Sequence, residues 1–95
     1  MAYIVGILRV RIRIPMCNSL KEKRGVLRGL ENHIRKKFNV SVAEIGDQDY
    51  WRSAELGVTT GSTDRDLVDQ ALHKVIGLIE REGDLQVVDF DVEIL

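Results

Sequence analysis

The segment AYIVGILRVRIRI, residues 2–14, decides the fold of this chain of 95 residues. Its apolar and basic residues alternate: one parity holds Ile4, Leu8, Val10, Ile12 and Ile14, and the other holds Arg9, Arg11 and Arg13. A period of two is that of a β-strand, because successive side chains point to opposite faces of a sheet. The segment therefore predicts a strand with one apolar face and a basic stripe on the other.

A helix follows this strand directly. Pro15 ends the strand, and Ser19 with Glu22 three residues later forms a capping-box pattern. Apolar residues then recur at helical spacing; they are Leu20, Leu27, Leu30, Ile34 and Phe38. We therefore expect a helix that begins at Asn18 or Ser19 and runs to about Lys37.

Two strands and a polar turn come next. Residues 39–46 and 54–60 have the composition of strands. The turn GDQDYWRS, residues 46–53, joins them and holds the only tryptophan, Trp51. The pattern therefore predicts a central hairpin.

The last third of the chain predicts a helix and a strand. Ser62 or Thr63 is the expected cap of the helix, and Gly83 is its expected stop. Residues 85–95 alternate again, which indicates a strand. Its expected inward set is Val88, Phe90, Val92 and Ile94.

The order strand, helix, strand, strand, helix, strand predicts an α+β fold. Two right-handed crossovers joined by a central hairpin give the ferredoxin-like βαββαβ arrangement. Both helices then cover one face of a four-stranded antiparallel sheet, and the other face stays open. The first strand is central, between the third strand and the last. We expect residues 1–95 to form one such domain.

The composition indicates a small domain without a membrane segment, a disulfide or a metal site. Hydrophobic residues make up 44% of the chain and charged residues 31%. No apolar run approaches the roughly 18 residues needed to span a bilayer. Cys17 is the single cysteine, which excludes an internal disulfide and a zinc site built on several cysteines. We expect a cytoplasmic protein that binds no cofactor.

The formal net charge of −1 is a sum over two unlike halves. Residues 1–37 carry ten Lys and Arg against two acids, which gives +8. Residues 38–95 carry four bases against thirteen acids, which gives −9. The polarity of the folded surface therefore depends on which elements lie side by side.

The stripes of opposite charge in the first and last strands are expected to meet on the open face. If these strands pair antiparallel, each arginine of the first lies opposite an acid of the last. The expected pairs are Arg9–Glu93, Arg11–Asp91 and Arg13–Asp89. Such pairs stabilise a sheet by roughly 0.2–1 kcal/mol apiece and disfavour a slipped register. In the alternative interpretation, the three arginines form a track for phosphates.

The same register gathers an apolar cluster at one end of the open face. Its members are Tyr3, Val5, Ile7 and Leu95. An uncovered apolar cluster on a small domain typically marks a contact surface. We expect a homodimer through this face or through an edge strand; a ligand pocket or a partner protein is the alternative.

The first helix keeps an excess of cations. Clustered Lys and Arg on one element are the electrostatic footprint of binding to a nucleic-acid backbone. The expected RNA-binding residues are Lys21, Lys23, Arg24, Arg28, Trp51 and Arg52. An ordinary solvated helix face is the alternative. The chain has no aromatic pair of the RNP type and no GXXG loop, so RRM-like or KH-like recognition is not predicted.

No catalytic constellation is recognisable in the sequence. The two histidines lie in different helices, and no HExxH, GxSxG, Walker or GxGxxG pattern occurs. Glu44, Asp47 and Asp49 near the turn do not have the spacing of an EF-hand loop. We therefore expect a non-enzymatic protein. Trp51 either closes the core under the first helix or stacks on a partner.

Three segments together resemble the YlxP-like family of small bacterial proteins, whose function is unknown. They are SLKEKRGVLRGL (19–30), FNVSVAEIGDQDYWRSAELGV (38–58) and VDFDVEIL (88–95). The resemblance covers nearly the whole chain and implies a ferredoxin-like domain. Members are often associated with genes of translation and ribosome assembly, which implies a role near RNA or the ribosome. The matching positions are Ser19, Lys21, Glu22, Lys23, Arg24, Glu44, Asp49, Trp51 and Arg52.

Overall fold

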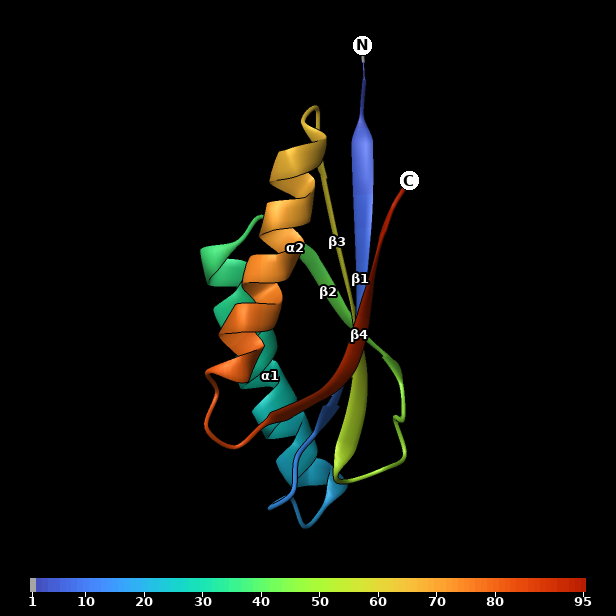
Figure 1. Ribbon diagram of the computed structural model, residues 1–95. Coiled ribbons are helices and arrows are strands. Elements are labelled where there is room, and N and C mark those ends of the chain that lie inside the picture. Colours follow the sequence, from blue (N-terminus) through green and yellow to red (C-terminus); the bar gives the residue numbers. More distant parts are fainter. Residues whose placement is uncertain (1) are drawn as a thin grey trace.

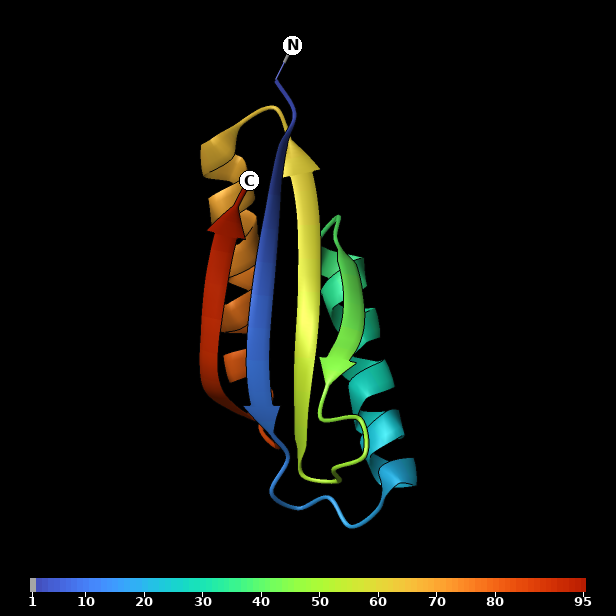
Figure 2. The same ribbon diagram turned by 90° about the vertical axis from the view of Figure 1, so that its right-hand side faces the viewer.

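Six elements follow one another in the predicted order over residues 2–95, the part of the chain that the computed structural model describes. They are β1 (Ile4–Arg13), α1 (Leu20–Lys37), β2 (Ser41–Gly46), β3 (Ser53–Ser62), α2 (Arg65–Glu80) and β4 (Gln86–Ile94). The sheet is antiparallel with the order β2-β3-β1-β4, so β1 is central and β4 is an edge. Figure 1 shows both helices on one side of the sheet, and Figure 2 shows the uncovered face. The ferredoxin-like α+β fold is confirmed.

The core lies between the sheet and the two helices. Leu8, Val10 and Ile12 of β1 are fully buried and alternate with the arginines, as the period of two predicts. Gly6 completes this face of β1. A Cβ at Gly6 would overlap Val68 of α2, so α2 packs directly on the backbone of β1.

The capping box of α1 is confirmed. The Glu22 N–H donates to Ser19 Oγ at 3.1 Å. The Glu22 carboxylate in turn accepts from the N–H of Asn18 at 2.8 Å, one residue before the cap. Two backbone donors at the start of α1 are thereby satisfied by side chains.

The cap of α2 is Asp64, and the prediction of Ser62 or Thr63 is wrong. Asp64 Oδ1 accepts from the backbone N–H groups of Asp66 and Leu67. A carboxylate at this position accepts hydrogen bonds as a hydroxyl does and also compensates the positive end of the helix dipole. α2 therefore begins at the residue after the carboxylate.

The charged stripes of β1 and β4 meet on the open face, with a register two residues away from the predicted one. Arg9 lies opposite Asp91, and Arg11 lies opposite Asp89. A slip of two residues keeps every side chain on its own face, so the alternation of the sequence does not distinguish the two registers.

A bulge in β4 separates Arg13 from the acids. Asp89 pairs with Arg11, but Val87 pairs with the next residue of β1, so Val88 has no partner in the ladder. A bulge of this kind changes the pairing beyond it. Arg13 consequently lies opposite the neutral Gln86.

The inward set of β4 is only partly as predicted. Val92 and Ile94 pack against the core. Val88 is exposed because it occupies the bulge, and Val87 packs against the core instead. Phe90 is also exposed, edge-on to a histidine ring of α2, because β4 is the edge strand on this side of the sheet.

Candidate functional site

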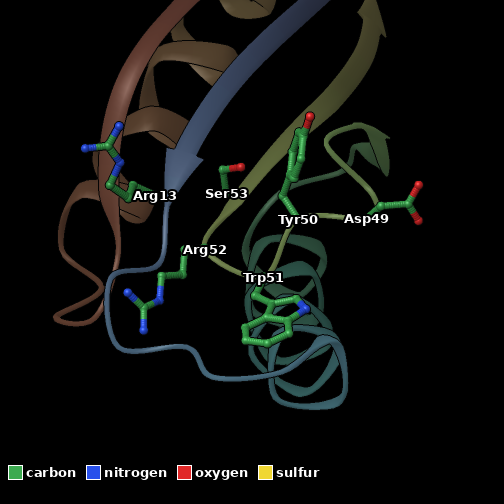
Figure 3. Close-up of a pocket in the computed structure, with 6 residues that line it drawn as sticks. All are labelled: Arg13, Asp49, Tyr50, Trp51, Arg52 and Ser53. Atoms are coloured by element: carbon green, nitrogen blue, oxygen red, sulfur yellow. The ribbon is translucent and has the colours of Figure 1, made fainter.

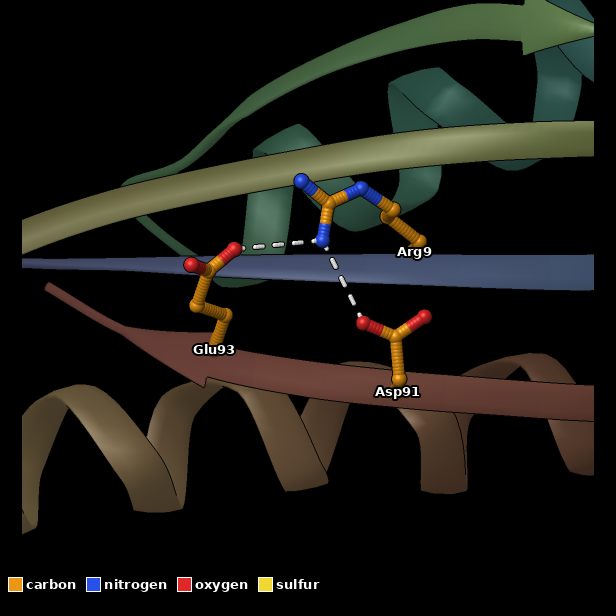
Figure 4. A network of polar contacts seen from close by, with 3 residues as sticks. All are labelled: Arg9, Asp91 and Glu93. Atoms are coloured by element: carbon orange, nitrogen blue, oxygen red, sulfur yellow. Dashed lines mark hydrogen bonds and ion pairs between the residues drawn. The ribbon is translucent and has the colours of Figure 1, made fainter.

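Two of the three arginines on β1 are engaged in ion pairs on the open face. Arg9 Nη1 lies 3.2 Å from Asp91 Oδ2 and 3.3 Å from Glu93 Oε1 (Figure 4). Hydrogen bonds to Glu93, and next to Asp91, raise the pKa of Arg9 above its ordinary value. Arg11 Nη2 lies 3.6 Å from Glu55 Oε2. A phosphate track along β1 would need these guanidinium groups free, so the pairing interpretation holds for both residues.

The loop between β2 and β3, residues 47–52 and here called the aromatic loop, carries two exposed rings. Asp47 has a φ of 58°, in the left-handed region that Asp tolerates better than most residues. Its C=O accepts from the N–H of Tyr50 at 3.1 Å, which closes a tight turn. Tyr50 and Trp51 are 63% and 51% exposed. The interpretation that Trp51 closes the core under α1 is therefore wrong, and its ring is available for stacking.

The aromatic loop and the end of β1 surround a shallow hollow of about 460 Å³. Its lining consists of Arg13, Asp49, Tyr50, Trp51, Arg52 and Ser53. Figure 3 shows the two aromatic rings on one side of Ser53 and the two guanidinium groups on the other, with the Asp49 carboxylate directed away. Within residues 2–95, neither Arg13 nor Arg52 forms an ion pair. Flat rings and uncompensated positive charge are therefore neighbours here.

Arg52 also has a structural part in this hollow. Its Nε donates to the C=O of Cys17 at 2.9 Å, and its own C=O accepts from the N–H of Ile14 at 2.7 Å. Cys17 is buried, and its thiol donates to the C=O of Ser19. The predicted RNA-binding residue Arg52 therefore ties the aromatic loop to the connection between β1 and α1 with part of its guanidinium group.

Lys23 is buried, which contradicts its prediction as an RNA-binding residue. Its side chain is only 2% exposed. Its Nζ donates to the C=O groups of Asp47 at 2.6 Å and of Tyr50 at 2.7 Å. The same Nζ lies 2.9 Å from Glu44 Oε2. Because two carbonyl oxygens and one carboxylate oxygen surround this buried ammonium, no phosphate reaches it.

Two signals in the sequence point to the pairing of Lys23 with Glu44. Lys23 stands three residues after Leu20 and four before Leu27, so it continues the buried stripe of α1. Glu44 has the parity of buried Val42 in β2 and therefore faces the helices. Because an isolated buried charge is costly, a lysine and a glutamate at inward positions are expected to pair.

The other cations in the first half of α1 lie at the surface. Lys21, Arg24 and Arg28 are exposed, and their spacing of three and four residues places them in one row, here called the basic row. None of them forms an ion pair within the described residues. Arg35, seven residues further along the same side, donates to the C=O of Val42 in β2 at 3.0 Å. The basic row therefore follows the β2 edge of the sheet, from which the aromatic loop also emerges.

The predicted interface residues lie on the open face, at the end opposite to the aromatic loop. Tyr3 and Leu95 are 75% and 65% exposed, whereas Val5 and Ile7 are partly buried. The Tyr3 ring lies against Gly61 of β3. The Leu95 N–H donates to the C=O of Val5 at 2.9 Å, which extends the pairing of the two strands. The four side chains are thus brought to one end of the sheet.

Neither a metal cluster nor a membrane span is found in residues 2–95. No three His, Cys, Asp or Glu side chains in this range gather closely enough to hold a metal ion. Neither helix is long and apolar enough to cross a membrane. His33 and His73 both lie at the surface, each beside a carboxylate.

Comparison with known proteins places the chain in a family. The family model described as "Protein of unknown function (DUF503)" matches residues 5–92. The chain belongs to the DUF503 family. The DUF503 match includes the basic row and the whole aromatic loop. "Uncharacterized protein YlxP" of Bacillus subtilis (strain 168) is 35% identical over 77 residues, which cover 81% of this chain and 84% of that protein. The resemblance to YlxP-like proteins is thereby confirmed.

A solved structure shows the same fold with an unrelated sequence. "De novo designed protein Foldit4" superposes with a TM-score of 0.58 over 99% of this chain and 97% of that chain, at 12% sequence identity. At this identity the likeness concerns the fold alone. It confirms that the arrangement of this DUF503 chain is one that quite different sequences adopt.

Proposed function

We propose that this chain is a non-enzymatic binding module for single-stranded RNA, whose site consists of the aromatic loop, the neighbouring Arg13 and the basic row. The observation that carries the proposal is the hollow itself. Tyr50 and Trp51 are exposed beside Arg13 and Arg52, which form no ion pair in the described residues. Proteins that bind single strands combine rings that stack on bases with cations that follow the backbone.

Unpaired RNA suits this site better than a duplex. In a double helix the faces of the bases are stacked on one another, so an aromatic side chain has access to a base only in loops, bulges and single strands. The basic row runs from Lys21 to Arg28, a distance of seven residue steps or about 10 Å at 1.5 Å per residue. A strand whose bases lie at the aromatic loop thus has cations available for its phosphates along α1.

The charges elsewhere on the molecule support the same location. Arg9 and Arg11 are engaged with acids on the open face. The unpaired cations of the first half of the chain lie instead on α1 and in the hollow. The total charge of −1 is therefore compatible with one local cationic surface.

The proposal is tested by binding of a fluorescently labelled single-stranded RNA of about 12 nucleotides, followed by anisotropy at several salt concentrations. We expect log K to fall linearly with log salt, by about 0.7 per phosphate contacted. Trp51→Ala should weaken binding by about 1–3 kcal/mol through loss of one stacked base. Replacing Arg24 and Arg28 together by Ala should reduce the salt slope by about 1.4.

Lys74→Ala is the matched control, because Lys74 is an exposed cation on α2, whereas the basic row lies on α1. We expect this variant to bind with an unchanged salt slope. Affinity that does not depend on salt, or equal losses from Lys74→Ala and from the change of Arg24 and Arg28, would contradict the proposed function.

The apolar end of the open face favours a second candidate, a homodimeric interaction domain without a nucleic-acid role. The exposure of Tyr3 and Leu95 supports it. Dimerisation over the whole face would also bury the Arg9 network, and removing charges from water is costly. Sedimentation at micromolar concentrations tests this candidate. A monomer, or a dimer that Ile7→Asp does not weaken, would contradict it.

A further inference from the structure

We infer that Lys23 is a positioning residue, which holds the aromatic loop in its binding shape from beneath. Its Nζ reaches two carbonyl groups of the loop, those of Asp47 and Tyr50, at 2.6 and 2.7 Å. These two residues are also joined by the hydrogen bond that closes the turn. Both ends of the turn are therefore held by one side chain from α1, directly before the ring of Trp51.

A lysine at position 23 provides hydrogen-bond donors, which an apolar residue does not. A Leu or Met would fill the same position in the buried stripe of α1, and burying an ion pair is seldom more stable than apolar packing. The C=O groups of Asp47 and Tyr50, however, lie outside the ladder of the sheet and meet α1 in partly buried contacts, where an apolar side chain has no N–H to donate to them. The ammonium of Lys23 supplies these donors and so selects one loop conformation.

Glu44 supplies the charge that keeps Lys23 buried. Its Oε2 lies 2.9 Å from Lys23 Nζ, which is the distance of an ion pair. The same oxygen is buried and has no aligned hydrogen-bond donor among the described residues. Two of the ammonium hydrogens are thus directed at the loop carbonyls, and Glu44 compensates the charge of Lys23.

The position of Lys23 on α1 also relates the loop to the basic row. Lys21 and Arg24 lie on the same turn of the helix and face solvent, while Lys23 faces the loop. One rigid helical turn therefore sets the spacing between the cations and the rings. A preformed site avoids the cost of ordering a loop on binding. This consequence for affinity rests on the proposed function, whereas the order of the loop does not.

The first experiment uses the fluorescence of Trp51, which is the only tryptophan. We expect Lys23→Met to make Trp51 roughly twofold more accessible to acrylamide quenching, because a loop without its buried contacts opens locally. Lys21→Met is the matched control, since it removes the same charge from an exposed position on the same turn. Its quenching should equal that of the unmodified protein. Circular dichroism at the same temperature checks that each variant is folded.

The second experiment separates positioning from contact with phosphate. Lys23→Met should weaken RNA binding roughly fivefold or more, while the salt slope stays unchanged. Lys21→Met should reduce the slope by about 0.7, because its side chain faces solvent in the basic row. A reduced slope in Lys23→Met would mean that Lys23 contacts a phosphate, and would overturn the inference.

Two further measurements keep the inference testable if Lys23→Met does not fold. In the unmodified protein, the amide of Tyr50 should exchange with solvent as slowly as the amides at the ends of the strands; exchange at the rate of a free peptide would overturn the inference. Glu44→Gln should raise the quenching of Trp51 above that of the unmodified protein, because it removes the charge that compensates Lys23; no rise would also overturn the inference. If Lys23→Met loosens the loop but the unmodified protein binds no RNA, the positioning role stands and the proposed function fails. If the unmodified protein binds RNA but Lys23→Met leaves the loop unchanged, the proposed function stands and the positioning role of Lys23 fails.

Discussion

Replacing glycine by alanine is expected to have opposite effects at two places in this fold. Gly25 and Gly29 lie on the exposed side of α1, and a Cβ at either position meets nothing within 4 Å. Gly6 lies beneath α2, where a Cβ would overlap Val68 and lie 2.9 Å from Leu72 Cδ1. The same chemical change therefore meets open space in one case and the packed core in the other.

The magnitudes follow from these surroundings. Glycine within a helix costs about 0.5–1 kcal/mol relative to alanine, mainly through the entropy of the unfolded chain. The double variant Gly25→Ala, Gly29→Ala should thus be more stable by about 1–2 kcal/mol, which raises the melting temperature by roughly 4–16 °C in a domain of this size. Gly6→Ala should lose about 1–3 kcal/mol, because α2 has to move away from β1.

Thermal unfolding followed by circular dichroism measures both effects, and urea unfolding gives the slope m as a check on two-state behaviour. A double variant on α1 with unchanged or lower stability would refute the reasoning that a Cβ at Gly25 and Gly29 meets open space. An unaffected Gly6→Ala variant would refute the close approach of α2 to β1.

Three further substitutions test other parts of the fold. Ser19→Ala should cost about 1 kcal/mol in urea unfolding, because α1 loses its capping hydroxyl. Leu72→Ala should cost about 2–5 kcal/mol, since the fully buried side chain leaves a cavity against the sheet; a loss below that range would indicate that the site collapses. A double-mutant cycle should give a small coupling between Arg11 and Asp89, about 0.2–1 kcal/mol and reduced by salt, and less between Arg11 and Asp91. Equal coupling in both cycles would contradict the observed register.

Periodicity was sufficient for the fold and insufficient for the pairing of its strands. The alternation in β1 and the apolar stripe of α1 each indicate which face is buried, and the order of the six elements with right-handed crossovers then predicts the topology. Alternation repeats every two residues, however, so it is equally satisfied by Arg9 opposite Asp91 and by Arg9 opposite Glu93. The bulge at Val88 is a local departure from the ladder that no period describes.

The sequence predicted where the candidate site lies, but it did not predict all of its residues correctly. The excess of cations on the first helix predicts Lys21, Arg24 and Arg28 as surface residues, whereas the sequence left two interpretations of Trp51 open, one of them in the core. The charge of Lys23 predicts a surface position, although its spacing places it in the buried stripe of α1. Arg13 joins the site only because β4 offers it Gln86 in place of an acid. Both the surface position predicted for Lys23 and the acidic partner predicted for Arg13 are wrong because tertiary contacts, which residue type does not specify, determine the surroundings of these side chains.

The aromatic side chains and the paired arginines of this chain lie in different places, the rings on the aromatic loop and the ion pairs on the open face. In an RRM, aromatic side chains on the sheet itself stack on bases. In this chain, the corresponding centre of the sheet holds Arg9 and Arg11 in ion pairs, and a base placed there would have to displace partners already bound. Arg13, the next arginine along β1, forms no ion pair in the described residues, and the exposed rings of Tyr50 and Trp51 line the same hollow. Extending the network by Gln86→Glu should therefore draw Arg13 away from the hollow and weaken RNA binding, whereas Gln86→Ala should not; equal binding by both variants would show that Arg13 has no part in the site.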